Sequence, residues 1–294
     1  MRLAYSISGY HLPRQFAWLM GAIRHADDLF VVHVDGRTAE PVFAELRAVA
    51  GEADNVVVID RQPITWMGIS LVEAELRAIR TALEVEPCFD YLISLSMQDY
   101  PLKSRAEIVA ALEAAPGRDY LTFEPLAEQP FHMRRRPWLW SFEHRGRLVR
   151  TILPRPIPRD LPIRWKGPWW RILSRETCAW LAASPLTERY LGFLKNVQAP
   201  DEFFFQNLLM QGLGTARLAD GYRHFIAWPG GSASPETLTM ARADALAASP
   251  MWYARKFDER VDERILHFLA NRIGAEVPAH ARTARVVSAS PIAA

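Results

Sequence analysis

The sequence predicts an α/β fold in which helices cover both faces of a mostly parallel sheet. Short apolar, β-branched runs alternate along the chain with longer segments whose apolar residues recur at helical spacing, and the links between them are short. The chain has 294 residues, of which 50% are hydrophobic and 23% charged, so it can bury a large core. This length allows one large α/β domain or two small ones.

The first half of the chain contains nine predicted elements, each with its own local signal. The first strand ends at Gly9, and in the helix after it Phe16, Leu19 and Ile23 share one face. An acidic residue ends the second strand, and the third helix is strongly amphipathic. The predicted strands are Arg2–Ser8, Leu29–Asp35, Val56–Ile59, Tyr91–Leu95 and Tyr120–Phe123. The predicted helices are Leu12–Arg24, Pro41–Ala50, Ser70–Leu83 and Arg105–Ala115. Parallel sheets of this kind bind ligands beyond the carboxyl ends of their strands.

A segment without regular periodicity opens the second half of the chain. Between Arg134 and Arg171, eleven Arg and Lys stand against two acids, together with six prolines and five tryptophans. This composition predicts a long ordered loop that lines a surface. Residues 274–294 are rich in Ala, Ser and Pro without an aromatic residue, which predicts a disordered tail. Order is expected to resume over Trp169–Leu173, with helices at Arg175–Ala183, Asp201–Gln211 and Asp258–Ile273 and a strand at Tyr222–Trp228.

The composition argues against several classes of protein. A net charge of +2 is not that of a polycation that seeks nucleic acid, and Cys88 and Cys178 cannot form a disulfide framework or a zinc site by themselves. No stretch reaches the ~18 apolar residues of a membrane-spanning helix. The N-terminus runs straight into a strand pattern and lacks the features of a signal peptide. We therefore expect a cytoplasmic protein.

The usual signatures of nucleotide-binding enzymes and hydrolases are missing. The chain has no GxGxxG after its first strand, no P-loop and no serine nucleophile elbow. It also has no D-x-D triplet, the pair of acids with which many nucleotide-sugar enzymes hold a divalent cation. His33 beside Asp35 would make a poor metal site, and we expect His33 to pack within its strand. Ten tryptophans indicate either a cleft for flat or ring-shaped ligands or large core residues.

Five sequence blocks occur in the order of a known family. They are HVD (33–35), YLISLSMQDYPLKS (91–104), WWRILSRE (169–176), PDEFFFQ (200–206) and YARKFD (253–258). From Leu3 to about Leu269 the chain resembles glycosyltransferase family 14, the core-2/I-branching β-1,6-N-acetylglucosaminyltransferases and peptide O-xylosyltransferases. The resemblance implies a GT-A fold in one catalytic domain over residues 1–273. Its nucleotide-binding half would end at about residue 124, and its acceptor-binding and catalytic half would span about 125–273.

The resemblance also implies the reaction, an inverting transfer from a UDP-sugar without a divalent metal. Glu202 matches the family's catalytic base, and Asp201 beside it would be a cap or an orienting group. From spacing alone, two acids at a helix start can equally compensate the helix dipole. Inversion needs one placed carboxylate and cations for the leaving diphosphate. Lys256 matches a family lysine with that task, Arg223 matches an arginine less securely, and Arg255 is the alternative to it.

Three further residues match the donor side of the family site. Asp35 matches an acid near the uridine, and Trp66 falls where an aromatic ring stacks on the base, although a buried packing role is the alternative for Trp66. Asp99 is expected to brace its turn through backbone amides. Met97 stands where most members carry glycine, so we expect this loop to differ locally from theirs within the same fold.

On the acceptor side, the resemblance implies that Glu124 binds hydroxyl groups and that Trp169 and Trp170 line the cleft. The run Arg134-Arg135-Arg136 matches basic acceptor contacts only loosely, and at least two of the three are expected in a solvated loop. The implied donor sugar is GlcNAc, xylose or glucuronate, and the acceptor a glycan, a polysaccharide or a lipid-linked saccharide.

The chain differs from the animal members in features that bear on its cellular location, and its composition allows an alternative function. The cysteines and the membrane stem of the animal members are missing, so we expect a bacterial-type cytoplasmic member, either free or peripheral at the inner membrane face. The alternative is a non-catalytic binding module that holds an anionic polymer or single-stranded nucleic acid through the Arg/Trp-rich segment 134–171. The joint presence of Glu202 and Lys256 favours the enzyme, because a binding module needs neither.

Overall fold

The computed structural model describes residues 1–229 and 234–282, and a seven-stranded sheet forms its centre. The strand order is β12-β6-β11-β4-β1-β2-β3. β11 is antiparallel to both of its neighbours, while every other pair in this sheet is parallel. The predicted α/β class with a mostly parallel sheet is therefore confirmed. The strands are β1 (Leu3–Gly9), β2 (Leu29–Val34), β3 (Val56–Val58), β4 (Tyr91–Ser96), β6 (Asp119–Leu121), β11 (Ile172–Ser174) and β12 (Leu218–Asp220).

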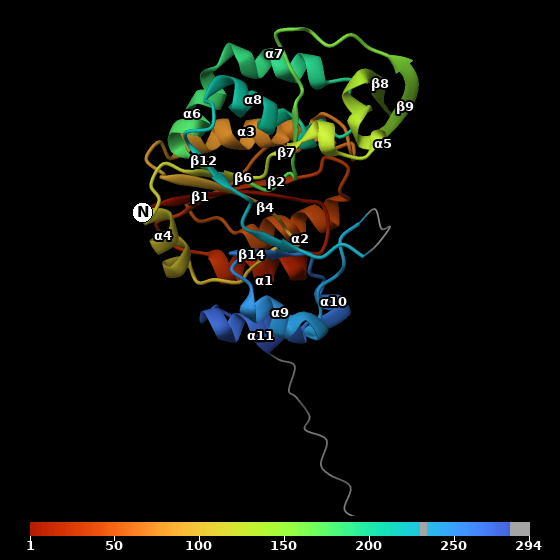
Figure 1. The fold of residues 1–294 in the computed structure, drawn as a ribbon. Coiled ribbons are helices and arrows are strands. Elements are labelled where there is room, and N and C mark those ends of the chain that lie inside the picture. The colour runs from red at the N-terminus through yellow and green to blue at the C-terminus, as the bar shows by residue number, and fades with distance from the viewer. Residues whose placement is uncertain (230–233, 283–294) are drawn as a thin grey trace, which may run out of the picture.

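Helices cover both faces of this sheet because its central strands are apolar on both sides. In β1, Ala4 packs into the core on one face, while Leu3, Tyr5 and Ile7 pack into the core on the other. Figure 1 shows α3, α6, α7 and α8 on the first face and α1 and α2 on the second. The first group is α3 (Ser70–Val85), α6 (Arg175–Ala183), α7 (Pro185–Leu194) and α8 (Phe204–Gly212). The second is α1 (Pro13–Ile23), α2 (Glu40–Ala50) and α4 (Arg105–Glu113).

A third layer lies beyond α1, around a small sheet of order β13-β14-β5. Its elements share a core cluster that includes Trp18 of α1, Tyr100 and Phe257. They are β5 (Tyr100–Pro101), β13 (His224–Ile226), η4 (Met240–Arg242), α9 (Ala243–Ala248), β14 (Tyr253–Arg255), α10 (Glu259–Asp262) and α11 (Arg264–Ile273). The helix predicted over 258–273 is thus two helices, the first of which is capped by the side chain of Asp258.

Part of the segment predicted as a disordered tail is ordered. Gly274 ends α11 in the left-handed conformation, and residues 279–282 form α12 (Ala279–Arg282). Ala281 is buried in the third-layer core, and the carbonyl of Glu276 lies so close to Gly21 that a Cβ there would be 2.8 Å from it. The prediction is therefore wrong for residues 274–282, because tertiary contacts order a segment with little local signal. Residues 283–294 lie outside the described residues.

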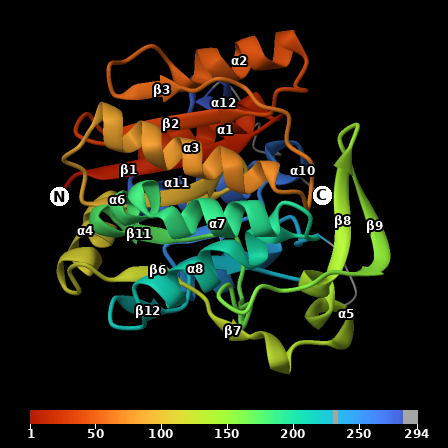
Figure 2. The ribbon, with the colours of Figure 1, turned by 90° about the horizontal axis from the view of Figure 1, so that it is seen from above.

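The segment predicted as one long loop is more regular than expected. It contains an antiparallel hairpin of β8 (Leu139–His144) and β9 (Arg147–Pro154), joined by Arg145 and Gly146, both with positive φ as a two-residue hairpin turn requires. Figure 2 shows this hairpin at the margin of the molecule, beyond the ends of β1 and β2. Around it lie β7 (Glu124–Pro125), η1 (Leu126–Glu128), α5 (Phe131–Arg134), η2 (Arg136–Trp138) and β10 (Trp165–Lys166).

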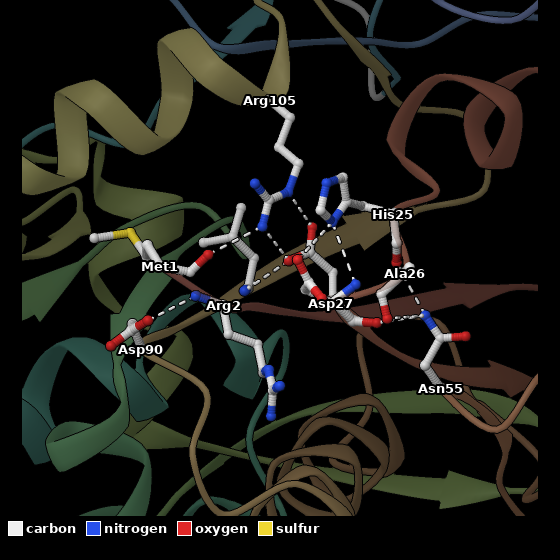
Figure 3. A network of polar contacts seen from close by, with 10 residues as sticks. Met1, Arg2, His25, Ala26, Asp27, Asn55, Asp90 and Arg105 are labelled. Atoms are coloured by element: carbon white, nitrogen blue, oxygen red, sulfur yellow. Dashed lines mark hydrogen bonds and ion pairs between the residues drawn. The ribbon is translucent and has the colours of Figure 1, made fainter.

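The amino-terminal end of the sheet is held by a polar network around buried Asp28. Its carboxylate accepts hydrogen bonds from the backbone N–H of Leu3 at 3.0 Å and from Arg105 at 2.6 Å. Asn55 donates to the Asp28 carbonyl at 2.7 Å, and Arg2 donates to Asp90 (Figure 3). These contacts join the starts of the strands, so the opposite, carboxyl-terminal edge is the one open to a ligand.

Candidate active site

Asp35 directly follows β2 at the carboxyl-terminal edge of the sheet. Its Oδ1 accepts hydrogen bonds from the backbone N–H groups of Arg37 at 2.9 Å and Ile64 at 3.2 Å, and Arg37 Nε lies 3.5 Å away. Asp35 therefore fixes the start of the loop that carries Trp66. His33 is buried within β2, as predicted, and burial lowers the pKa of its imidazole to about 4.

Trp66 lies in the loop between β3 and α3 with 73% of its surface exposed. The alternative of a buried packing residue is therefore wrong. The next residue, Met67, has positive φ, and its carbonyl accepts a hydrogen bond of 2.8 Å from the backbone N–H of Ala199. This bond ties the Trp66 loop to the turn that presents Glu202.

Asp99 is fully buried and is the centre of a polar cluster below the edge of the sheet. Its carboxylate accepts hydrogen bonds from Ser96 N at 2.8 Å, Ser96 Oγ at 2.7 Å and Trp170 Nε1 at 3.1 Å. His224 Nε2 lies 3.6 Å and Arg255 Nε 3.5 Å from it. Burial opposes ionisation of Asp99, but His224 and Arg255 outweigh burial and keep its pKa below the ordinary value. Of these contacts, one comes from a backbone amide, that of Ser96, as the predicted bracing of the turn requires, and the others come from side chains.

Lys256 follows β14 and is attached to the same turn. The backbone N–H of Phe257 donates to the Gln98 carbonyl at 2.9 Å, and Gln98 Nε2 donates to the Phe257 carbonyl at 3.2 Å. Lys256 is partly exposed, and in the described part of the chain no carboxylate forms an ion pair with it. Its ammonium is therefore available to an anionic ligand.

The two arginines predicted to assist Lys256 differ in position. Arg255 is adjacent to Lys256, and its guanidinium lies 4.3 Å over the ring of Trp170. Arg223 precedes β13, and the parallel register sets His224 beside Tyr253 at the far end of β14. Its guanidinium lies over Tyr120 at 4.8 Å and Trp252 at 5.6 Å. The backbones of Arg223 and Lys256 are thus about 13 Å apart along the strands, at ~3.3 Å per residue. Arg223 therefore lies far from Lys256 along the strands, whereas Arg255 is its neighbour in sequence and directs its guanidinium to Trp170 and Asp99.

Met97 packs tightly in the loop where a glycine was expected. It is 1% exposed, and a Cβ on Gly9 would lie 2.3 Å from its sulfur. The glycine at the end of β1 therefore makes room for the methionine after β4, which keeps the loop closed over the strand ends.

Glu202 lies in the 3₁₀ turn η3 (Pro200–Glu202) rather than in the first turn of the predicted helix, which starts at Phe204. Its Oε2 is 2.9 Å from Arg136 Nη1 and 3.5 Å from Lys166 Nζ. Lys166 Nζ also lies 3.8 Å from Glu124 Oε2, because Glu124 and Lys166 are directly paired in the β7–β10 ribbon. Both cations are mostly buried, so the Glu202 carboxylate is held by positive charge from two sides.

Sequence reasoning missed Lys166 and gave Arg136 only a loose match. Arg134 and Arg135 are exposed, as expected for two of the three arginines. Their neighbour Arg136 reaches Glu202 because it starts η2, which turns the chain toward the base of the β8–β9 hairpin. The basic Trp-rich composition was the available signal, but it does not distinguish one cation from another.

Asp201 makes no side-chain cap at its turn, so the capping role predicted for it is not found. Burial and the negative charge of Glu202 raise the pKa of Asp201 to about 7. Arg171 nearby is 2% exposed, lies 3.5 Å over the ring of Phe205 and partly offsets that rise. The orienting role of Asp201 stays a prediction.

Trp169 and Trp170 are buried, at 7% and 8% exposure, rather than open to a cleft. They meet edge to face, with ring centroids 5.9 Å apart, and the guanidinium of Arg171 lies 5.3 Å over Trp169. Their rings therefore offer little free face for stacking on a sugar. The prediction of an acceptor platform is corrected to a supporting role, in which Trp170 holds Asp99 and Arg255.

A hollow of about 510 Å³ adjoins the Asp35 loop, between that loop and the β8–β9 hairpin. Arg37, Gln62 and Thr65 line it from the loop, and Glu143 and Arg145 line it from the hairpin. Within residues 1–229 and 234–282, no cluster of three His, Cys, Asp or Glu side chains has the geometry to hold a metal ion.

The fold and this edge define a class of protein, an α/β chain in which two cations hold the carboxylate of Glu202 and Lys256 has no ion-pair partner among the described residues. Residues 3–248 match the model of the family described as "Branch: Core-2/I-Branching enzyme". The chain belongs to that family.

Two relatives are about a quarter identical to the chain over the aligned positions. Human xylosyltransferase 2 is 27% identical over an alignment of 296 positions, which covers 92% of this chain and 33% of the relative. The bovine "Beta-1,3-galactosyl-O-glycosyl-glycoprotein beta-1,6-N-acetylglucosaminyltransferase 3" is 25% identical over 208 residues, 70% of this chain and 46% of the relative. The chain thus spans a third to a half of the length of these relatives. Apo mouse xyloside xylosyltransferase 1 aligns over 86% of this chain and 96% of its own, with 12% identity and a TM-score of 0.39.

Proposed function

We propose that the protein is an inverting, metal-independent glycosyltransferase. It moves GlcNAc, xylose or glucuronate from a UDP-sugar to a hydroxyl of a glycan or polysaccharide acceptor. The observation that carries the proposal is the Glu202 carboxylate, held between Arg136 and Lys166 in a chain of the core-2/I-branching family. The relatives named xylosyltransferase and N-acetylglucosaminyltransferase support the transfer of such sugars.

Inversion is one in-line displacement at the anomeric carbon. The carboxylate of Glu202 takes the proton of the acceptor hydroxyl while that oxygen forms the new bond to C1. The bond from C1 to the diphosphate oxygen breaks on the opposite face, and its electron pair leaves with UDP. Lys256 neutralises the charge that grows on the diphosphate, and Arg255 beside it supplements that field. Glu202 ends the step as a carboxylic acid and returns its proton to solvent.

The donor and acceptor sides of this site rest on different elements. Asp35 and Trp66 would bind the nucleoside beyond β2, where the loop is already fixed by backbone hydrogen bonds. Glu124 would bind acceptor hydroxyls, and Lys166 holds it beside Glu202. Arg136 and Lys166 hold the Glu202 carboxylate in place before the acceptor arrives, so the base is already positioned.

The alternative of a non-catalytic binding module is not supported. The family match covers residues 3–248 and includes the Arg/Trp-rich segment 134–171 on which that alternative depended. Two cations of the segment, Arg136 and Lys166, pair with Glu202 instead of facing a polymer.

We further propose that the acceptor is a lipid-linked saccharide and that transfer takes place in the cytoplasm, at the inner membrane face. The support is the basic, aromatic segment beside Glu202, which suits an anionic surface better than free solution. In the described ranges of the chain, no helix is both long enough and apolar enough for a bilayer crossing.

A panel of UDP-sugars tests the function. UDP release with UDP-GlcNAc, UDP-xylose and UDP-glucuronate is measured with a saccharide acceptor, and one donor is expected to give turnover that depends on acceptor. UDP release from every donor at the rate of a heat-denatured control would overturn the proposal.

Chelation should leave transfer unchanged. The sequence has no D-x-D triplet, and the proposal assigns neutralisation of the diphosphate to Lys256 and Arg255. With the active donor, initial rates are measured before and after EDTA treatment, and again after Mn²⁺ or Mg²⁺ is added. Loss of activity in EDTA and its return with either cation would show that the metal-free mechanism is wrong.

Trp66→Ala should weaken UDP binding without lowering stability. Stacking of a base on an aromatic ring is worth ~1–3 kcal/mol, so the dissociation constant should rise about 5- to 150-fold. Because Trp66 is 73% exposed, the thermal midpoint should stay that of the wild type. Phe131→Ala removes an equally exposed ring from α5 and is the matched control. Titration calorimetry measures the dissociation constant of UDP for both variants. Equal affinities of both variants would remove Trp66 from the donor site.

A further inference from the structure

Exposed apolar side chains gather on the segment around the β8–β9 hairpin. Ile152 is 85% exposed, more than any other large hydrophobic residue in the described chain, and Phe131 is 71% exposed. Folded proteins seldom leave such a group open to water unless it binds something. The exposed set, which we call the hairpin surface, comprises Phe131, Trp138, Phe142, Val149, Ile152 and Leu153.

The hairpin has one face on the protein and one face in solvent. Ser141 is buried, with its backbone N–H donating to the Asn196 carbonyl at 2.9 Å, and Glu143 accepts a hydrogen bond of 3.1 Å from Ser70 N. Successive side chains of a strand alternate between faces, so the cross-strand pair Phe142 and Val149 lies on the opposite, outer face. This face of the sheet has no covering element among the described residues.

The other members of the hairpin surface adjoin the ends of the hairpin. The carbonyl of Trp138 accepts a hydrogen bond of 2.9 Å from the backbone N–H of Arg155, which places η2 beside the end of β9. Figures 1 and 2 both show α5, which carries Phe131, next to the hairpin.

The charge around the hairpin surface is of one sign. Arg134, Arg135, Arg147 and Arg150 are exposed, and none forms an ion pair within the described residues. The only acid from Gln129 to Arg159 is Glu143, which is hydrogen-bonded to Ser70. The surface therefore combines aliphatic and aromatic side chains with unpaired arginines.

We propose that the hairpin surface docks on an anionic lipid bilayer. Arginines bind the phosphate headgroups, while Ile152, Leu153 and Trp138 enter the boundary between headgroups and acyl chains. Charge complementarity alone would equally suit a polysaccharide or a nucleic acid. The aliphatic side chains favour lipid, because exposed Ile and Leu gain nothing from a hydrated polyanion and are buried by acyl chains.

Docking would orient the active site. Arg136 lies between α5 and Trp138 in sequence and pairs with Glu202 at 2.9 Å, so the hairpin surface and the base are joined by one short segment. A saccharide carried on a lipid in the same bilayer would meet Glu202 from that side. This part of the inference rests on the proposed function, whereas the docking itself does not.

Vesicle sedimentation with the full chain tests the docking without donor or acceptor. The wild type should bind phosphatidylglycerol vesicles and not phosphatidylcholine vesicles. Arg134→Gln with Arg147→Gln should lower the partition coefficient about 25-fold, because each arginine contributes about fivefold. Ile152→Ser with Leu153→Ser should lower it at least about tenfold. Val85→Ser with Val261→Ser removes two exposed valines elsewhere and should bind as the wild type does.

Two results would overturn the inference. The wild type could fail to bind phosphatidylglycerol vesicles, or the serine pair at Ile152 and Leu153 could bind as the wild type while the glutamine pair does not. The second result would identify a polyanion surface instead of a lipid one. Transfer to a soluble acceptor, measured with the same variants, should stay at the wild-type rate. Loss of transfer in every protein, including the wild type, would count against the proposed function and not against docking.

Discussion

Glu202→Gln is expected to abolish transfer while UDP binding stays near the wild-type level. The amide keeps the shape of the side chain but cannot take the proton of the acceptor hydroxyl. Loss of a general base lowers turnover roughly 10²–10⁴-fold. Donor affinity should persist, because the contacts of Glu202 are with Arg136 and Lys166 on the acceptor side of the site.

Turnover, UDP affinity and the thermal midpoint are measured together for this variant. Glu124→Gln is the matched comparison, since it removes the other carboxylate that Lys166 contacts. It should raise the KM for the acceptor with a smaller effect on kcat. Near-normal turnover of Glu202→Gln would remove Glu202 from the role of base and leave Asp201 as the candidate.

Lys256→Ala should lower turnover more than it weakens binding of the intact sugar nucleotide. Charge on the diphosphate grows as the bond to C1 breaks, so a cation aimed there interacts more strongly in the transition state than in the ground state. Removal of one such contact costs on the order of 3 kcal/mol, or about 10²-fold in rate. In the structure, this lysine has no ion-pair partner among the described residues that could share its charge.

Lys256→Arg should restore activity only in part, because the planar guanidinium differs from an ammonium in reach and geometry. The measurement is kcat and donor KM for both variants. A raised KM with unchanged kcat would show that Lys256 binds the ground state and the transition state equally. The leaving-group role would then move to an arginine. Arg255 would then be tested before Arg223, since only Arg255 adjoins Lys256 in the strand register.

The regular elements could be predicted from local sequence alone. Apolar periodicity over β1, β2, α3 and β4 depends on residues no more than four apart, and these elements appear within one or two residues of the predicted bounds. The hairpin at 139–154 was not predicted from the sequence. Its exposed face is apolar and its flanks are rich in Arg and Pro, which obscures the alternation of a half-buried strand.

Single site residues at strand ends could be predicted for the same reason. Asp35 follows a recognisable strand, and Asp99 lies in a recognisable turn, so both were expected near the edge of the sheet. The burial of Trp169 and Trp170 could not be predicted. A tryptophan pair has the same sequence signal in a cleft and in a core. Here the contacts of Trp170 with Asp99 and of Trp169 with Arg171 show that the pair belongs to the buried interior.

By itself, then, the sequence determined the α/β class, the order of the main strands and helices in the first half of the chain, and the chemistry available in the five blocks. The tertiary structure decided which charges meet. Glu202, Arg136 and Lys166 lie far apart in the chain and are joined through η2 and the pairing of β7 with β10. The physical reason is range: helix and strand signals act between near neighbours, whereas an ion pair depends on a distance that only chain packing and strand register fix.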